Sequence, residues 1–193
     1  MRFLRQSSLE EYAKWYLDRQ RYKGGDKAES APIPVRAEQQ IATMRTAHCG
    51  KMRDWFQESR WHIVELDAVD LSKLVFLESC WTKEKRLVIP NPNEPNYRIL
   101  RQVAENALKS DYLNHLPHDH PELKKYYEAL IRGELQLVGR HRIVVCSAEN
   151  EITSNPDARY YLLDGTVRCL AYMMLLLEGK VEGRPIEAFL AER

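Results

Sequence analysis

The feature that most constrains the fold is the alternation of strand-like and helix-like segments in the last third of the chain. Short runs rich in β-branched and aromatic residues are typical of strands, and a longer apolar run closed by a glycine is typical of a helix. The strand-like runs are 142–148, 159–164 and 184–192, and the helix-like run is 166–180. Strands that alternate with helices in this way predict an α/β, or α+β, fold.

The first half of the chain adds helical segments to this pattern. Residues 7–25 predict a helix that begins at Ser8, because Ser8 and Glu11 have the spacing of a capping box. A second helical region is expected over 37–60. We therefore expect residues 1–60 to form a helical N-terminal extension of the core.

Residues 61–193 are expected to form that core. They begin with a strand over 61–66 and a short turn or helix over 67–74, and three prolines make 90–96 a loop. A helix over 97–113 and a turn followed by a helix over 115–134 predict a helical insertion around 97–133.

Composition excludes several classes of protein. The 29 basic and 28 acidic residues give a formal net charge of +1, which argues against a strongly basic protein that coats DNA. No apolar run reaches the roughly 18 residues of a spanning helix, and the first residues lack the apolar core of a signal peptide. We therefore expect a cytoplasmic protein without membrane attachment.

The four cysteines, Cys49, Cys80, Cys146 and Cys169, lie far apart in the sequence. This spacing predicts reduced, packed thiols rather than a zinc or redox site.

The junction Asp164-Gly165-Thr166-Val167-Arg168 carries the main indication of function. Gly165 suits a sharp turn from strand to helix, and the helix that follows presents free backbone N–H groups. These groups and the helix dipole favour an anion, which would also explain a cation at Arg168 in the first turn. An ordinary alternative also fits, in which Asp164 caps the helix and Arg168 pairs with a surface carboxylate.

The order strand, DGTVR, helix, short loop and strand (YYLLDG…VR…LAYMML…GRPIEAFLAE) resembles the ParB/sulfiredoxin-like superfamily. Members carry a G-x-x-R element at this junction. The earlier WHIVELDAVDLSKL is similar to the family's opening strand and turn. The resemblance extends over about 61–193 and is specific over the last 35 or so residues.

This resemblance implies a phosphate-binding loop formed by Gly165, Thr166, Val167 and Arg168, with Asp164 beside it. Relatives include CTP-binding partition proteins, ATP-using sulfiredoxins, free serine kinases and domains described as nucleases, so ATP or CTP with Mg²⁺ is the implied cofactor. In kinase-like relatives an early acid faces the loop. Glu78 is our candidate for that acid, and Asp164 and Glu78 are the candidate catalytic residues.

The junction departs from the catalytic relatives in two ways. Thr166 and Val167 stand where a DGHHR-type loop has histidines. Cys169 follows the arginine, whereas the sulfiredoxin cysteine precedes it, which argues against sulfiredoxin activity.

Further candidates lie outside the junction. Arg140, in GRHR over 139–142, is expected to form a basic rim with Arg168 for phosphates or nucleic acid, or simply a solvated edge. The histidines His115, His118 and His120 form either a metal site or a polar turn. Other acids considered as a base or magnesium ligand are Glu65, Asp67 and Asp70.

Two functions therefore remain open from the sequence. One is a protein that binds a nucleotide or phosphorylated small molecule, with phosphotransferase or NTPase activity. The other is a non-catalytic module that binds nucleic acid or a partner protein in a plasmid, phage or defence setting.

Overall fold

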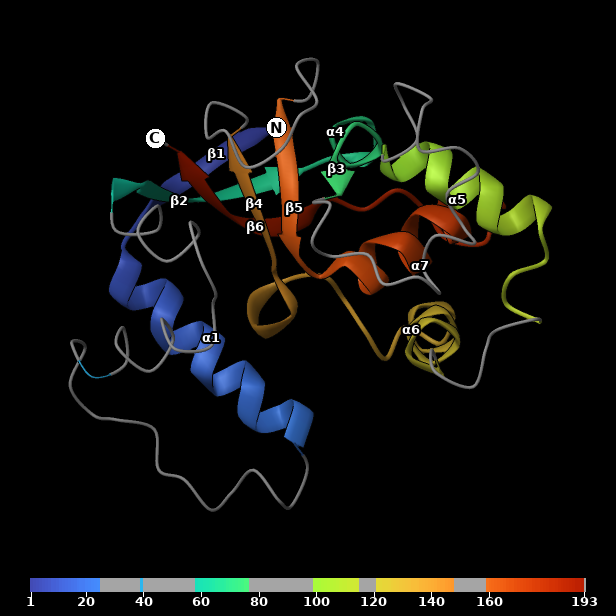
Figure 1. Cartoon of the computed structure of the whole chain (residues 1–193), viewed down its shortest axis with the longest axis horizontal. Helices are drawn as coiled ribbons and strands as arrows, with labels where there is room; N and C mark the ends of the chain where they lie inside the picture. The colour runs from blue at the N-terminus through green and yellow to red at the C-terminus, as the bar shows by residue number, and fades with distance from the viewer. Residues whose placement is uncertain (25–38, 40–57, 77–98, 115–120, 148–158, 193) are drawn as a thin grey trace.

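The computed structural model describes residues 1–24, 39, 58–76, 99–114, 121–147 and 159–192 of the chain. Its centre is a mixed six-stranded sheet in the order β1-β2-β6-β4-β5-β3 (Figure 1). The strands are β1 (Arg2–Ser7), β2 (Arg60–Leu66), β3 (Val75–Phe76), β4 (Ile143–Ser147), β5 (Tyr160–Asp164) and β6 (Ile186–Glu192). The helices are α1 (Leu9–Gly24), α4 (Ala68–Ser72), α5 (Leu100–Lys109), α6 (Pro121–Ile131), α7 (Thr166–Leu177) and the 3₁₀ turn η4 (Gly139–His141). The α/β fold class predicted from the sequence is confirmed.

The sheet is mixed because β6 runs parallel to β4 and antiparallel to β2. Strand β5 is antiparallel to β4, with Asp164 opposite Val144. The end of β5, the turn η4 and the beginning of α7 therefore meet at one end of the sheet.

Both faces of the sheet are buried at the central strands β4 and β6, which explains the nearly continuous apolar runs of these strands. In β4, Ile143 and Val145 pack beneath α5, α6 and α7, whereas Val144 and Cys146 pack on the side of α1. In Figure 1, α1 lies to the left of β4 and β5, whereas α5, α6 and α7 lie to their right. The strands thus separate two hydrophobic clusters, one on each face.

The cluster under α1 is aromatic. The ring of Tyr12, 1% exposed, stacks on Trp61 at a centroid distance of 4.4 Å and meets the edge of Phe189 at 5.5 Å. Such rings bury large apolar areas and add favourable pair contacts. This packing fixes α1 against β2 and β6.

The expected helical extension over 1–60 contains a strand that the sequence pattern does not reveal. Strand β1 pairs antiparallel with β2, from Arg2 opposite Glu65 to Ser7 opposite Trp61. Its side chains are mostly exposed, so its backbone pairing leaves no hydrophobic alternation in the sequence. The predicted helix over 7–25 is confirmed as α1, and the backbone N–H of Glu11 donates to Ser8 Oγ at 3.2 Å.

The helical insertion predicted around 97–133 appears as α5 and α6. Both pack against α7. Four residues of α5 recur at helical spacing and are buried: Leu100, Val103, Ala104 and Ala107. The insertion therefore builds much of the core on the α7 face. The predicted helix over 37–60 and the loop at 90–96 lie outside the described residues, apart from a few positions of the former.

The described cysteines agree with the prediction of packed thiols. Cys146 and Cys169 are buried and free, in the two different clusters. Burial raises the pKa of the Cys169 thiol to about 12, which makes it a poor nucleophile. Cys49 and Cys80 lie outside the described residues.

None of the helices in the described part of the chain combines the length and the apolar character needed to span a bilayer.

Candidate anion-binding site

The turn from β5 into α7 requires a glycine. Gly165 has a φ of 91°, in the left-handed region, and a Cβ atom added there would lie 2.7 Å from Ile143 Cγ2. The carbonyl of Gly165 accepts the first helical bond from Cys169 N at 2.8 Å. No side chain caps the helix, so the N–H groups of the first turn of α7 lack a side-chain acceptor.

Asp164 does not cap this helix. Its Oδ1 accepts from the backbone N–H of Gly165 at 2.7 Å and from Arg19 Nη2 at 2.8 Å, and Oδ2 contacts Arg19 Nη1. The pair is bidentate and joins α1 to the end of β5. The guanidinium of Arg19 also lies over the Trp15 ring, 5.2 Å from its centroid.

Arg168 points into the protein. Its side chain donates from Nη1 to His141 O at 2.8 Å and from Nη2 to Arg142 O at 3.3 Å, and the residue is 2% exposed. Burial lowers the pKa of Arg168. Among the described residues Arg168 forms no ion pair, so the alternative of a surface carboxylate partner is not seen there. Arg168 instead fixes the position of η4 against α7.

The turn η4 is held from two further sides. Trp15 Nε1 donates to Gly139 O at 3.1 Å, which ties η4 to α1. Arg142, directly after the turn, pairs with Glu187 at 2.5 Å between Nε and Oε2, and Gly139 N donates to the same oxygen at 3.3 Å. Arg140 is exposed on this anchored turn.

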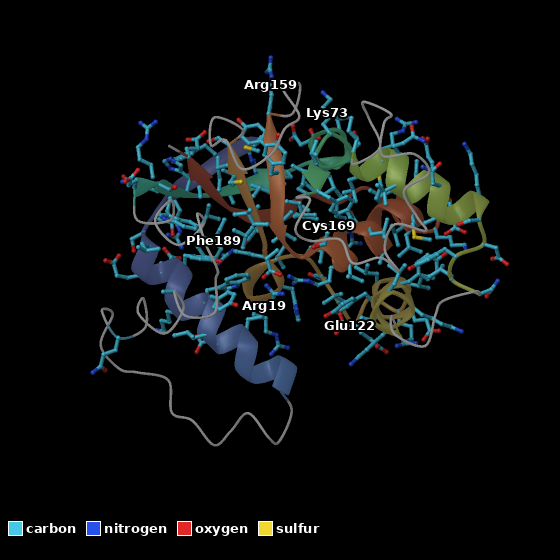
Figure 2. The ribbon with its side chains drawn as sticks, in the orientation of Figure 1. Arg19, Lys73, Glu122, Arg159, Cys169 and Phe189 are labelled. Carbon is cyan, nitrogen blue, oxygen red and sulfur yellow. The ribbon has the colours of Figure 1, made fainter. Side chains whose placement is uncertain are left out.

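Positive charge gathers around His141. Burial lowers the pKa of His141, and the nearby guanidinium groups of Arg168, Arg140 and Arg19 lower it further. These groups come from α7, η4 and α1. In Figure 2, Arg19 lies close to this end of the sheet, whereas Arg159, just before β5, lies at the opposite end. Burial also lowers the pKa of Arg19 to about 10, which leaves it charged at neutral pH.

The arrangement is suited to binding an anion. Three cations lie near an uncapped helix start, and Asp164 offsets one of them. Helix N-termini favour anions through their free N–H groups and dipole. A bound anion would therefore relieve the repulsion among these cations.

Arg19 and His141 were missed by sequence reasoning. Arg19 follows Tyr12 and Trp15 at helical spacing on the buried face of α1, and a cation at such a position indicates a buried partner. Its partner Asp164 lies 145 residues away in sequence, which no local pattern reveals. The sequence contains no comparable signal for His141.

The other sequence candidates do not join this cluster. Glu65 pairs with Arg2 at 2.7 Å, Asp67 caps α4, and Asp70 completes that capping box and contacts the terminal amino group. Glu78, His115, His118 and His120 lie outside the described residues. The part of the chain that is described holds no group of three or more potential metal-ligating His, Cys, Asp or Glu residues.

Comparison of the chain with protein-family models, with curated proteins and with solved structures gives no match, so the resemblance read from the DGTVR junction remains a prediction.

Proposed function

We propose that the protein binds the phosphate group of a nucleotide, or of another phosphorylated small molecule, at the start of α7. The observation that supports this most is the gathering of Arg19, Arg140 and Arg168 around His141 beside an uncapped helix start. A phosphate is a compact polyanion, and such groups bind well at helix N-termini. The proposal agrees with the resemblance to ParB-like proteins, and ATP or CTP with Mg²⁺ are the first ligands to test.

The residues of the junction take different roles in this proposal. The first-turn N–H groups of Thr166, Val167 and Arg168 contact the phosphate, together with the side chain of Arg140. Gly165 permits the turn. The guanidinium of Arg168 acts as a positioning group, because it donates to two carbonyls of the η4 region and is 2% exposed.

Binding is favoured over chemistry at this turn. A general base needs an oxygen that can take up a proton, but both oxygens of Asp164 already contact Arg19, and Oδ1 also accepts from Gly165 N. Thr166 and Val167 offer no side chain that titrates near neutral pH. We therefore assign Asp164 a bracing role, and a phosphotransferase or NTPase activity would need Glu78 or another acid.

Calorimetric titration with ATP, CTP and inorganic phosphate, each with and without Mg²⁺, tests the proposal. Arg140→Gln should weaken binding by about 10- to 150-fold, because a hydrogen bond to a charged group contributes about 1.5–3 kcal/mol. The matched control is Arg159→Gln, which removes the same charge at the opposite end of β5 and should leave the affinity unchanged. Equal affinities for all three proteins, or no binding at millimolar ligand, would refute the proposal.

The second candidate is a non-catalytic module that binds nucleic acid. The specific observation in its favour is that Arg168 is engaged with backbone carbonyls while Arg140 stays exposed on η4. Phosphate contacts to nucleic acid give affinities that fall steeply with salt. Binding of single- or double-stranded DNA or RNA that weakens with salt, without nucleotide binding, would favour this candidate. A partner protein is the remaining form of this alternative.

A further inference from the structure

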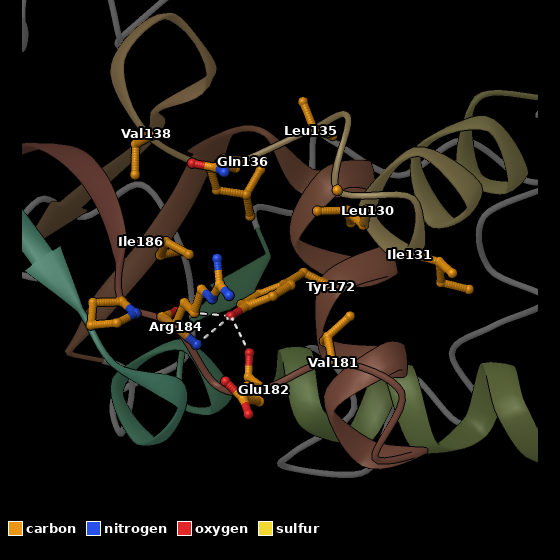
Figure 3. Close-up of a pocket in the computed structure, with 13 residues that line it drawn as sticks. Leu130, Ile131, Leu135, Gln136, Val138, Tyr172, Val181, Glu182, Arg184 and Ile186 are labelled. Carbon is orange, nitrogen blue, oxygen red and sulfur yellow. Dashed lines mark hydrogen bonds between the residues drawn. The ribbon is translucent and has the colours of Figure 1, made fainter.

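A cavity of about 390 Å³ opens on the far side of the segment that leads into η4 (Figure 3). It lies between the end of α6, residues 133–138, Tyr172 of α7 and the segment 181–186 that precedes β6. This volume falls within the range of small-molecule sites, about 300–1,000 Å³. None of the residues assigned to the phosphate site lines it.

The cavity walls are mainly apolar. Five lining residues belong to the hydrophobic core and are buried: Leu130, Leu135, Leu137, Tyr172 and Ile186. Two others, Ile131 and Val138, are 49% and 37% exposed and are among the few exposed large hydrophobic residues of the described chain. An apolar hollow with an exposed apolar rim favours a ligand that has a hydrocarbon body.

Hydrogen bonds of Tyr172 hold one wall of the cavity in place. The hydroxyl of Tyr172 accepts from Arg184 N at 2.8 Å and lies 2.8 Å from Arg184 O and 3.3 Å from Glu182 O. These contacts fix the backbone of the segment before β6 against α7. These hydrogen bonds therefore also fix the backbone position from which the side chain of Arg184 extends.

One cation faces this apolar space. Arg184 lines the cavity, and within the described part of the chain its guanidinium makes no hydrogen bond or ion pair. Figure 3 shows its side chain pointing toward the centre of the lining residues, whereas the carboxylate of Glu182 points the other way. The charge of Arg184 is thus not offset by the nearest acid of the lining.

From this we infer a second binding site, which takes a small monocarboxylate with a hydrocarbon chain. The planar guanidinium of Arg184 matches a carboxylate in a two-point contact, and the apolar walls accept the chain. A hydrated polyanion such as a nucleotide phosphate does not suit these walls, because they offer few partners for its polar atoms. The ligand class therefore differs from that of the start of α7.

Octanoate is the probe for this site, and 1-octanol is its neutral counterpart of the same length. Isothermal calorimetry and amide chemical shifts should show saturable binding of octanoate, with shifts at Gln136, Tyr172 and Ile186. Arg184→Gln should weaken octanoate binding by about tenfold and leave the weaker binding of octanol unchanged. Arg159→Gln serves as the charge control and should bind octanoate as the wild type does.

Val181→Phe provides a second variant, because the added ring would narrow the cavity and should weaken binding of both probes. Thermal unfolding of each variant checks that it is folded. Failure of octanoate to bind at millimolar concentration, wild-type affinity in Arg184→Gln, or octanol binding as tightly as octanoate would overturn the inference. ATP and phosphate titrations of Arg184→Gln should match the wild type, so this site and the phosphate site can fail separately.

Discussion

At the scale of single residues, Gly165 has the sharpest consequence for stability. Gly165→Ala should lower the free energy of unfolding by about 2–4 kcal/mol, because alanine in the left-handed region is strained and its Cβ would lie 2.7 Å from Ile143 Cγ2. Urea unfolding followed by circular dichroism measures the change. Gly133→Ala is the matched control: its φ of 69° carries the same strain, but a Cβ there meets no atom within 4 Å. Equal losses in the two variants would show that the contact with Ile143 is unimportant.

His141 should make stability depend on pH. Burial and the guanidinium groups of Arg168, Arg140 and Arg19 hold its pKa below the usual 6.5 in the folded protein. Below pH 6.5 the unfolded chain therefore binds a proton that the folded protein does not bind until lower pH, so stability falls as the pH decreases through that window. Comparison of urea unfolding between pH 7.5 and pH 5 should show a smaller loss for His141→Gln than for the wild type.

The same histidine reports on the proposed ligand. A phosphate bound among these cations would favour the charged imidazole and raise the pKa of His141. An NMR titration of the histidine ring with and without inorganic phosphate measures this shift. An unchanged pKa at saturating phosphate would mean that the anion binds elsewhere.

At the scale of elements, the ion pair between Arg19 and Asp164 joins α1 to the β5–α7 junction. Arg19→Met should destabilise the protein by about 2–4 kcal/mol, because it leaves a largely buried carboxylate without its cation. The double variant Arg19→Met/Asp164→Asn should recover a substantial part of that loss, since it removes the unpaired charge. Chemical unfolding of the single and double variants gives the coupling energy. Losses that simply add would indicate that the two side chains do not act as a pair.

The elements with a regular hydrophobic pattern could be predicted from the sequence. Helices α1, α5, α6 and α7 and strands β2, β4, β5 and β6 all lie where periodic apolar residues place them. Strand β1 was missed because its side chains are mostly exposed, and β3 because it has only two residues, Val75–Phe76.

The site was predictable in part for a related reason. The turn at Gly165 could be predicted from local chemistry, because a glycine between a strand and a helix readily adopts the positive φ that a sharp turn requires. The partners of Arg168 and Asp164 could not be predicted from local chemistry, because they lie in the η4 region and in α1 and are brought close only by tertiary packing. The sequence therefore indicated the turn at which we propose that an anion binds, but it placed the Arg168 guanidinium on the ligand, whereas the structure places it on the carbonyls of His141 and Arg142.

At the scale of the whole molecule, the question is whether the N-terminal β1–α1 unit folds with the rest. It adds a strand to the same sheet, and its helix covers one face of β2, β4 and β6 through the aromatic cluster around Tyr12. Figure 1 shows α1 on the opposite side of the sheet from α7. Val144 and Phe189 belong to this cluster and are buried. Without α1, these apolar side chains of the sheet would be exposed to water. We therefore expect one cooperative unit rather than a core with a dispensable extension.

Tyr12→Ala tests this expectation. Loss of a ring that is 1% exposed and stacked on Trp61 should cost about 3–5 kcal/mol. In a single cooperative unit, hydrogen exchange of the Val144 and Val145 amides in β4 and of the Leu175 amide in α7 should accelerate by the same factor as exchange in α1. If α1 alone lost protection while β4 and α7 kept theirs, residues 1–24 would behave as an extension that unfolds by itself. Lys14→Ala is the control, because Lys14 lies on α1 but is exposed. It should leave the hydrogen-exchange rates in β4 and α7 unchanged.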